Sequence, residues 1–280
     1  MESLVEIFQK AKEVLCKYDY YIYTSKRVLR VTNSELKIPH LMGLQYIGRP
    51  NQYSGDYGVY AIKKKRITHD SIAKLVKKYY RGEEKQRIMF EMIYRKLNNL
   101  HLLEEMFRSH SILYLYKKTE KSAFFCDYLL VCTSGKAILH LGLLEAVDKK
   151  DVYHCNSFMA TYQTDRERDM YFCNLTQSYD INKIVREDKD TKRRETVYQS
   201  AESREREKNG IRKMLLLNGI EPQEKLLSEI IKINMKFGKY HLLQELTDLP
   251  TMLAKCGDDG EKVLVNSLMM RLEESTKTGS

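Results

Sequence analysis

The first part of the chain alternates between helical and extended hydrophobic patterns. Apolar positions recur with the 3.6-residue period of an α-helix over residues 3–17. Two runs rich in β-branched and aromatic residues, at 20–24 and 28–32, flank a short polar turn and predict a β-hairpin. Pro39 is placed to open a short helical turn over 37–44. Residues 48–60 are rich in glycine, asparagine and tyrosine and predict an exposed loop.

The middle of the chain changes from helical to extended patterns. A capped helix is predicted from Thr68 to about residue 80, and a second helix over about 83–107. The second helix has an apolar stripe made of Phe90, Ile93, Leu97, Leu100, Leu103 and Phe107. Short β-branched or aromatic runs then predict a meander of four strands, at 112–117, 124–132, 136–141 and about 153–162.

The last part of the chain is more strongly charged. Charges of both signs alternate from about residue 180 to 208, which predicts a solvated helix or a linker. Three or four helices are predicted over 211–275. Together, these patterns predict an α+β fold in which N-terminal helices pack on an antiparallel β-sheet meander, followed by an all-helical C-terminal region. The predicted parts are a domain over 1–175, a charged helix or linker over 176–210, and a helical partner-binding or oligomerisation module over 211–280.

Composition narrows the class of protein. No apolar run approaches the roughly 18–20 residues that cross a bilayer, and the N-terminus lacks the pattern of a signal peptide, so a cytoplasmic protein with no membrane contact is expected. None of the six cysteines is spaced as Cys-x-x-Cys, which favours buried reduced thiols over disulfides or zinc. His154 and Cys155 with His140 are a weak metal candidate, and we expect no metal ion and no cofactor.

The net charge of +10 is concentrated in the first part of the chain. Residues 1–175 have 29 lysines and arginines against 20 acidic residues, whereas residues 176–280 have 19 against 18. A basic surplus of this kind attracts polyanions through phosphate contacts and counterion release. The alternative is surface lysine that serves solubility. We therefore predict a nucleic-acid partner, RNA in particular, for the N-terminal part.

RNA can be cleaved without a metal ion, because its 2′-hydroxyl can attack the adjacent phosphorus. An enzyme must then accept one proton, donate another and stabilise negative charge on the phosphorane. Histidine titrates near neutral pH and can fill either proton role. His40 is the candidate, since it follows Pro39 at the change from hairpin to helix, and Gly43 allows a close backbone approach. A structural histidine that donates to a nearby carbonyl is the alternative.

Several motifs occur in an order that resembles a known nuclease family. They are the two strands of the predicted hairpin, His40-Leu41-Met42-Gly43-Leu44, Arg87 with Phe90, Cys126-Asp127-Tyr128-Leu129-Leu130, His140-Leu141-Gly142-Leu143 and Asn156-Ser157-Phe158. The chain is similar over about residues 10–165 to the fourth, phage-associated branch of the barnase–EndoU–colicin–RelE-like nucleases. The resemblance implies a helical N-terminal part packed on an antiparallel sheet, and RNA cleavage without a metal ion.

The resemblance also implies roles for individual residues. His40 matches the His-Leu-x-Gly-Leu signature and would be a general acid or base. Arg87 matches a basic position early in the long helix and would face the phosphate. Ser157 matches the polar residue of the last strand and would donate a hydrogen bond to the phosphate. Asp127 and Tyr128 match a strand pair, in which Asp127 would orient a basic group and Tyr128 would contact nucleic acid.

Each of these residues also has an ordinary structural explanation. Arg87 flanks the apolar stripe and could be a solvated helix residue. Ser157 could be an ordinary strand hydroxyl, and Asp127 could serve only to end a strand. Met159 stands where the family pattern leads us to expect an aromatic residue.

A basic run and several tyrosines extend the candidate nucleic-acid surface. Lys63, Lys64, Lys65 and Arg66 could grip backbone phosphates, or form a solvated loop. Tyr60 follows closely and could stack on an unpaired base, as could Tyr46, Tyr53 and Tyr57. Most tyrosines in proteins are half-buried packing residues, which is the alternative here.

These observations lead to one principal hypothesis and two alternatives. The principal hypothesis is a metal-independent endoribonuclease that acts as a toxin or defence effector of a bacterial mobile element. Its C-terminal helices would bind an inhibitor or partner protein, or mediate self-association. The first alternative is a catalytically inactive RNA- or DNA-binding protein on the same fold. The second is an interaction protein of a mobile element with no role in nucleic-acid binding.

Overall fold

A computed structural model of the chain describes residues 2–49, 52–117, 125–162 and 175–217, together with Glu224, Leu227, Ser228 and Ile231. The chain divides into two compact units, Met1–Ile181 and Asn182–Ser280. Most of the helical tail predicted over 211–275, and with it the proposed partner-binding module over 211–280, lies outside the described residues.

Helices make up most of the chain between the first hairpin and the third strand. Ser3 caps the first helix in a reciprocal capping box with Glu6. The helical elements before the third strand are α1 (Leu4–Leu15), η1 (Glu35–Lys37), α2 (Ile38–Leu41), η2 (Leu44–Tyr46), α3 (Gly55–Lys63), α4 (His69–Tyr79), α5 (Glu83–Asn99), η3 (Leu100–Glu104) and α6 (Glu105–Arg108). Within the described part of the chain, no helix is both long and apolar enough to cross a membrane.

The strands form one sheet that closes on itself. They are β1 (Tyr18–Thr24), β2 (Val28–Val31), β3 (Ser111–Tyr116), β4 (Tyr128–Ser134), β5 (Ala137–Ala146), β6 (Lys149–Tyr162), β7 (Leu175–Asp188) and β8 (Arg194–Gln199). Their order is β1-β2-β6-β5-β4-β3-β7-β8, and β1 also pairs with β7. Among the described residues, seven strands therefore form a closed barrel, and β8 extends β7 outside it.

The predicted fold class is therefore wrong. The four strands predicted between residues 112 and 162 are neighbours in the sheet, as β3 to β6. However, they do not form an open meander covered by N-terminal helices, because β2 pairs in parallel with β6 and β1 pairs with β7. The N-terminal hairpin thus completes the barrel, and the helices flank the closed sheet. A closed sheet has no exposed edges along the strands that close it.

Two further segments differ from the sequence-based expectation. The region over 176–210, expected as a charged helix or linker, contains β7, β8 and the start of α8 (Ala201–Leu217). Its alternating charges arise from strands with one exposed face, and Tyr179 and Ile181 are the buried positions of that alternation. The loop expected over 48–60 ends before Gly55, where α3 begins. An all-helical C-terminal region is not supported.

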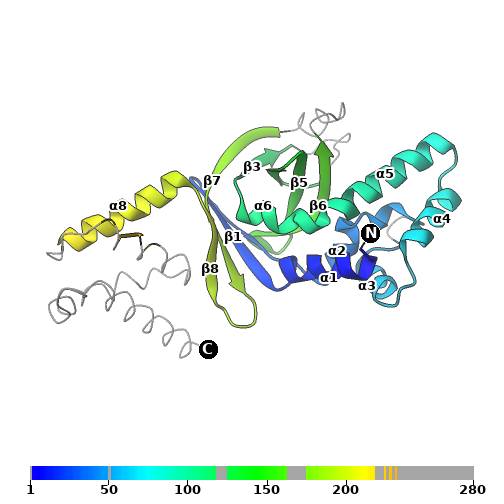
Figure 1. Cartoon of the computed structure of the whole chain (residues 1–280), viewed down its shortest axis with the longest axis horizontal. Helices are drawn as coiled ribbons and strands as arrows, with labels where there is room; N and C mark the ends of the chain where they lie inside the picture. The colour runs from blue at the N-terminus through cyan, green and yellow to red at the C-terminus, as the bar shows by residue number, and fades with distance from the viewer. Residues whose placement is uncertain are drawn as a thin grey trace. The chain divides into compact units, whose positions relative to one another are not determined.

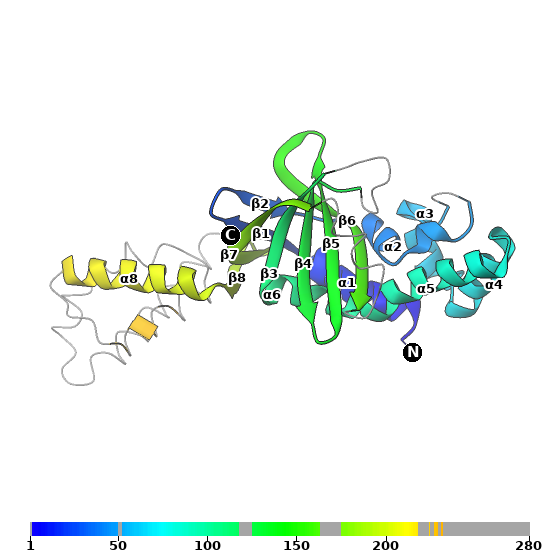
Figure 2. The ribbon, with the colours of Figure 1, turned by 90° about the horizontal axis from the view of Figure 1, so that it is seen from above.

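The strand β6 lies beneath the helices that matter for the site. Both α2 and α5 pack against it. Figures 1 and 2 agree that α2, α3, α4 and α5 gather on one side of the closed sheet. Apolar side chains of the strands form the core of the barrel, with Leu113, Leu139 and Leu141 fully buried.

Candidate functional site

His40 lies in the single turn of α2, where its ring is partly exposed. No hydrogen bond joins its ring to another residue among those described. Burial, together with the positive charges of Lys96 and Lys37, lowers the pKa of His40 to about 4. The ring is therefore neutral at neutral pH and has a lone pair that can accept a proton, whereas burial and the two lysines make it a weaker base than an ordinary histidine.

Lys96 is the charged residue with the largest effect on the pKa of His40, and it was not predicted as a site residue. Its side chain is 2% exposed although it belongs to α5, a helix with a largely exposed N-terminal half. Its Nζ lies 5.2 Å from the ring centroid of Tyr46. Burial alone lowers the pKa of Lys96 to about 7, because no carboxylate among the described residues pairs with it. At neutral pH this amine is thus present in both charged and neutral forms.

The backbone turn at Gly43 allows Lys96 to occupy this position. Gly43 ends α2 in the left-handed region, with a φ of 84°. A Cβ placed at Gly43 would lie 3.1 Å from the Lys96 Cδ and 3.5 Å from the Ile93 Cα. The glycine of the His-Leu-x-Gly-Leu motif therefore provides both the backbone conformation and the space for the lysine.

Substitution of Gly43 can separate its effect on backbone conformation from its effect on the space for Lys96. Gly43→Ala is expected to lower the unfolding free energy by more than Gly135→Ala. Both changes place a side chain in the left-handed region, at a cost of about 1–2 kcal/mol. Only the first also presses on Lys96, since nothing lies within 4 Å of a Cβ at Gly135. Equal losses in urea unfolding of the two variants would show that Lys96 does not depend on Gly43.

A short set of contacts connects this site to α4. The Tyr80 hydroxyl donates to the backbone carbonyl of Tyr46 at 2.6 Å. Tyr46 in turn has its ring beneath Lys96, and burial raises the pKa of the Tyr46 hydroxyl. The end of α4 is thereby fixed against the segment that follows α2.

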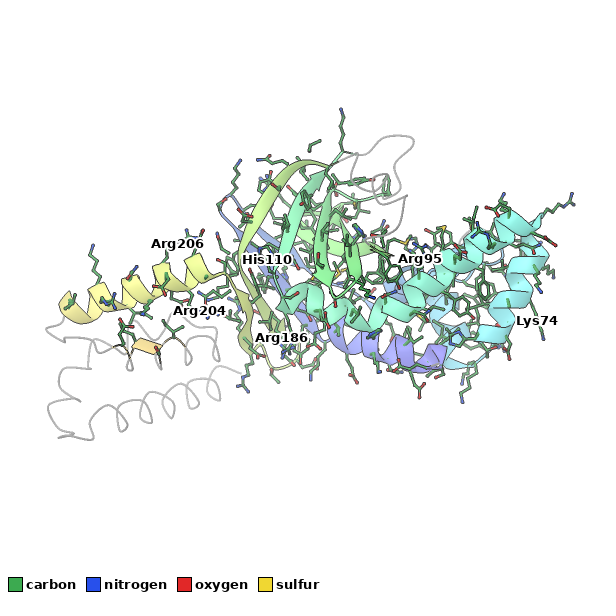
Figure 3. All side chains as sticks on the ribbon, turned by 45° about the horizontal axis from the view of Figure 1, so that its top comes forward. Lys74, Arg95, His110, Arg186, Arg204 and Arg206 are labelled. Carbon is green, nitrogen blue, oxygen red and sulfur yellow. The ribbon has the colours of Figure 1, made fainter. Side chains whose placement is uncertain are left out.

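Arg87 lies apart from His40 and Lys96. Its guanidinium forms ion pairs with Glu84 at 2.9 Å and Glu91 at 2.7 Å on the same exposed side of α5. It precedes Lys96 by nine residues, which is about 13 Å along a helix axis. Figure 3 shows Arg95 at the end of α5 that lies next to the sheet. In this structure, the charge beside His40 therefore comes from Lys96 and Lys37.

Asp127 and Ser157 lie at the sheet rather than on the helices. The Asp127 carboxylate accepts a hydrogen bond from the backbone N–H of Glu145 at 2.7 Å. Asp127 and Lys37 have opposite effects on the pKa of His154 on β6, which burial lowers. Lys37 thus acts on both His154 and His40, whereas Asp127 acts on His154 alone of the two. Ser157 lies on β6, opposite Gly142 of β5, and no hydrogen bond of its hydroxyl to another described residue is found.

The predicted basic run divides into two parts. Lys63 forms an ion pair with Glu35 at 2.9 Å. No ion pair joins Lys64, Lys65 or Arg66 to another residue of the described ranges. The Arg66 guanidinium lies 4.7 Å from the ring centroid of Tyr60, which is a cation–π distance. These three cations thus remain available to an anionic ligand.

Tyr128 occupies a different position from the other predicted nucleic-acid residues. It is 4% exposed, and its ring lies against those of Tyr153 and Tyr179. Its hydroxyl accepts a hydrogen bond from Arg27 at 2.5 Å. The ring is thus enclosed at the barrel, and only the Arg27 end of this cluster is exposed.

The described residues contain no group of three or more His, Cys, Asp or Glu side chains that could hold a metal ion. His140 is fully buried, and its Nε2 lies 3.0 Å from the Thr161 hydroxyl. Cys155 is also buried, where Asn33 donates to its sulfur. Cys16, Cys126, Cys132 and Cys155 are free thiols, and Cys173 and Cys256 lie outside the described residues.

Comparison with known proteins gives one match. The model of a family described as phage-Barnase-EndoU-ColicinE5/D-RelE like nuclease4 matches residues 3–203. The match begins just before α1 and ends just inside α8, so it includes every strand of the barrel as well as His40 and Lys96. Neither the search of curated proteins nor that of solved structures gave a match.

Proposed function

Because this chain belongs to the phage-Barnase-EndoU-ColicinE5/D-RelE-like nuclease 4 family, we propose that it is a ribonuclease that cleaves RNA without a metal ion. The family supports a nuclease, and the choice of RNA rests on the chemistry of the site. The observation that carries the proposal is the position of His40, a partly exposed neutral imidazole beside Lys37 and Lys96.

The proposed reaction needs only the groups at this site. His40 takes the proton of the ribose 2′-hydroxyl as its oxygen bonds to the adjacent phosphorus. The bond from phosphorus to the 5′-oxygen breaks, and the leaving oxygen takes a proton from water at the site, because the Lys96 ammonium is buried. Lys37 and Lys96 stabilise the negative charge that develops on the phosphorane. The products are a 2′,3′-cyclic phosphate and a free 5′-hydroxyl.

Two of the predicted residues have less direct roles in this proposal. Asp127 lies near His154, whose pKa it raises while Lys37 lowers it. Arg87 is already neutralised by Glu84 and Glu91, so it can contact a phosphate only if one of these carboxylates moves away.

A chimeric oligonucleotide tests the proposal. It is a DNA strand with one ribonucleotide, incubated with the protein in excess chelator beside an all-DNA strand. We expect cleavage only after the ribonucleotide, with a cyclic phosphate on one product and a 5′-hydroxyl on the other. Cleavage of the all-DNA strand would exclude attack by the 2′-hydroxyl. Salt-sensitive binding without any cleavage would indicate a binding protein instead.

We further propose that this activity makes the protein a toxin or defence effector. The support is the phage-associated character of the family. Induced expression in bacterial cells should then stop growth and fragment cellular RNA, and the His40→Ala protein should do neither. Normal growth at equal protein levels would contradict this role.

A further inference from the structure

The exposed tyrosines of the described residues gather on one surface. Among the large apolar side chains, only three tyrosines are counted as exposed, namely Tyr57 at 45%, Tyr60 at 40% and Tyr79 at 37%. Tyrosine normally packs at least half of its ring against the protein. All three occur on α3 and α4, and no exposed tyrosine is found elsewhere in the described ranges.

These side chains form an ordered row with Tyr53. The ring centroids of Tyr53 and Tyr57 are 5.8 Å apart, and those of Tyr57 and Tyr60 are 6.2 Å apart. Neighbouring rings are tilted by 39°, so they do not cover one another's faces as stacked rings do. Burial raises the pKa of the Tyr53 hydroxyl, and the neighbouring Tyr57 and Tyr79 raise it further, so Tyr79 lies near Tyr53. We call Tyr53, Tyr57, Tyr60 and Tyr79 the tyrosine row.

The row follows from the way α3 packs. The opposite face of α3 is buried, through Val59, Ala61 and Ile62. Tyr57 and Tyr60 are three residues apart and therefore share the outward face. The buried face of α3 fills the core on this side, so the rings of Tyr57 and Tyr60 have no packing role there.

Cations border the tyrosine row. Arg66 lies over Tyr60 at 4.7 Å, and the Lys78 Nζ lies 5.8 Å from the ring centroid of Tyr79. Lys64 and Lys65 follow α3 directly and are exposed. Asp56 is the acidic residue in the first turn of α3. The surface is thus aromatic with a surplus of positive charge, which is the composition that binds single-stranded nucleic acid.

The elements that hold the row pack against those of the site described above. A Cβ at Gly58 of α3 would lie 2.8 Å from the Cβ of Pro39, the residue before His40. At the other end, Tyr79 is followed by Tyr80, whose hydroxyl binds the Tyr46 carbonyl. The helix α3 and the end of α4, which hold the row, therefore contact α2 and η2, the two elements on either side of Gly43.

We propose that the tyrosine row binds the unpaired bases of single-stranded RNA and directs the strand to His40. Bases stack on aromatic side chains when their faces are free, whereas in a duplex those faces are already stacked on neighbouring base pairs. Lys64, Lys65 and Arg66 bind the phosphates of the same strand. The substrate class is therefore unpaired RNA. The direction of the strand towards His40 rests on the proposed function, and the binding itself does not.

An oligonucleotide that cannot be cleaved tests binding by the tyrosine row separately from cleavage at His40. The probe is a fluorescent single-stranded oligonucleotide with 2′-O-methyl groups, compared with its duplex by anisotropy. Tyr60→Leu and Tyr57→Leu are each expected to weaken single-strand binding by about 5- to 100-fold, the range of one base–aromatic stack. Duplex binding should change less than about twofold, since no base face is lost. Tyr60→Phe keeps the ring and should bind as the unmodified protein does.

Matched variants exclude a general loss of charge or structure. Tyr21 is a partly exposed tyrosine with Arg30 5.9 Å from its ring centroid, and Tyr21→Leu should leave binding unchanged. Lys136→Gln removes an exposed cation elsewhere and should leave the salt dependence of single-strand binding unchanged. Arg66→Gln should weaken single-strand binding and reduce its salt dependence by about one phosphate contact.

Three results would overturn the inference. The first is unchanged single-strand affinity in Tyr57→Leu and Tyr60→Leu, as expected if the row binds a protein. The second is an equal loss of duplex binding, and the third is an equal loss in Tyr21→Leu. A protein that binds the probe through the row but cleaves no RNA would retain this inference and contradict the proposed function.

Discussion

Replacing His40 with alanine is expected to lower RNA cleavage in excess chelator by about a hundred- to ten-thousand-fold, the range that general acid–base catalysis contributes. The loss should be mainly in kcat, because the imidazole acts on the proton that moves in the reaction and not on the strand as a whole. Binding of a single-stranded 2′-O-methyl oligonucleotide should change little. The measurement is the rate of cleavage at the ribonucleotide of the chimeric strand.

The matched control is His101→Ala, which removes an exposed histidine from η3 and should cleave as the unmodified protein does. Chemical rescue provides a second readout, because a small imidazole in the buffer can take the place of the missing ring. We expect added imidazole to restore part of the rate in His40→Ala and none in Lys96→Met. A cleavage rate within threefold of the unmodified protein in His40→Ala would exclude His40 as the proton acceptor.

The second large effect is expected at Lys96. Lys96→Met should unfold at higher urea than the unmodified protein at neutral pH, and yet cleave RNA about a hundred- to a thousand-fold more slowly. Methionine keeps the buried methylene chain beside Gly43 and removes an ammonium that has no partner carboxylate among the described residues. A residue that costs stability and supports activity is typical of a functional site.

The sign of the stability effect depends on pH. The pKa of Lys96 falls from 10.5 in its ordinary state to about 7 in the folded protein. Protonation of this group is therefore destabilising, fully so below pH 7, and the penalty disappears as the pH rises to 10.5. Because each pKa unit is worth about 1.4 kcal/mol, the contribution is on the order of 5 kcal/mol. The unfolding free energy of the unmodified protein should accordingly gain this contribution between pH 7 and 10, and that of Lys96→Met should not.

Urea unfolding at pH 6, 8 and 10 provides this measurement. Lys74→Met is the control, since Lys74 is an exposed lysine of α4 (Figure 3) and should show the pH dependence of the unmodified protein. The cleavage rate should also decline above about pH 7, where Lys96 loses its proton, and Lys96→Met should lack this decline. If Lys96→Met is less stable than the unmodified protein at pH 6, then Lys96 is held by a favourable interaction instead.

The local elements of the site were predictable from sequence. The hairpin over 20–32 and the short turn opened by Pro39 appear as β1, β2 and α2, because their signals lie within a few residues of one another. The helix cap at Thr68 is likewise local, with a side chain that binds the Ser71 N–H. His40 could therefore be placed at the start of a turn, although its neighbours could not be identified.

The closure of the barrel was not predictable in the same way. The parallel pairing of β2 with β6, and the pairing of β1 with β7, join segments whose hydrophobic patterns allow many partners. The signal in β7 was present, since Tyr179 and Ile181 alternate with polar residues. It is interrupted where the register shifts between Ile184 and Val185, and the surrounding charges then resemble a solvated helix.

Lys96 shows which signal was missed at the site. It is a lysine three residues after Ile93 and one before Leu97, both in the apolar stripe that the sequence defined. A lysine within such a stripe usually extends its amine to solvent. Here Gly43, more than fifty positions earlier, covers the methylene chain, and the Tyr46 ring lies beside the amine. Conversely, Arg87 has the expected spacing, but Glu84 and Glu91 of its own helix bind it.

The pairing between Val31 and Tyr153 connects positions 122 residues apart, and this has a consequence for synthesis on the ribosome. At about 5–20 residues per second, β2 is translated some 6 to 24 seconds before its partner in β6. During that interval, α2 has no strand to pack on, so His40 and Lys96 are not held in place. We therefore expect the nascent protein to be unable to attack the messenger and ribosomal RNA around it until translation of the barrel is almost complete.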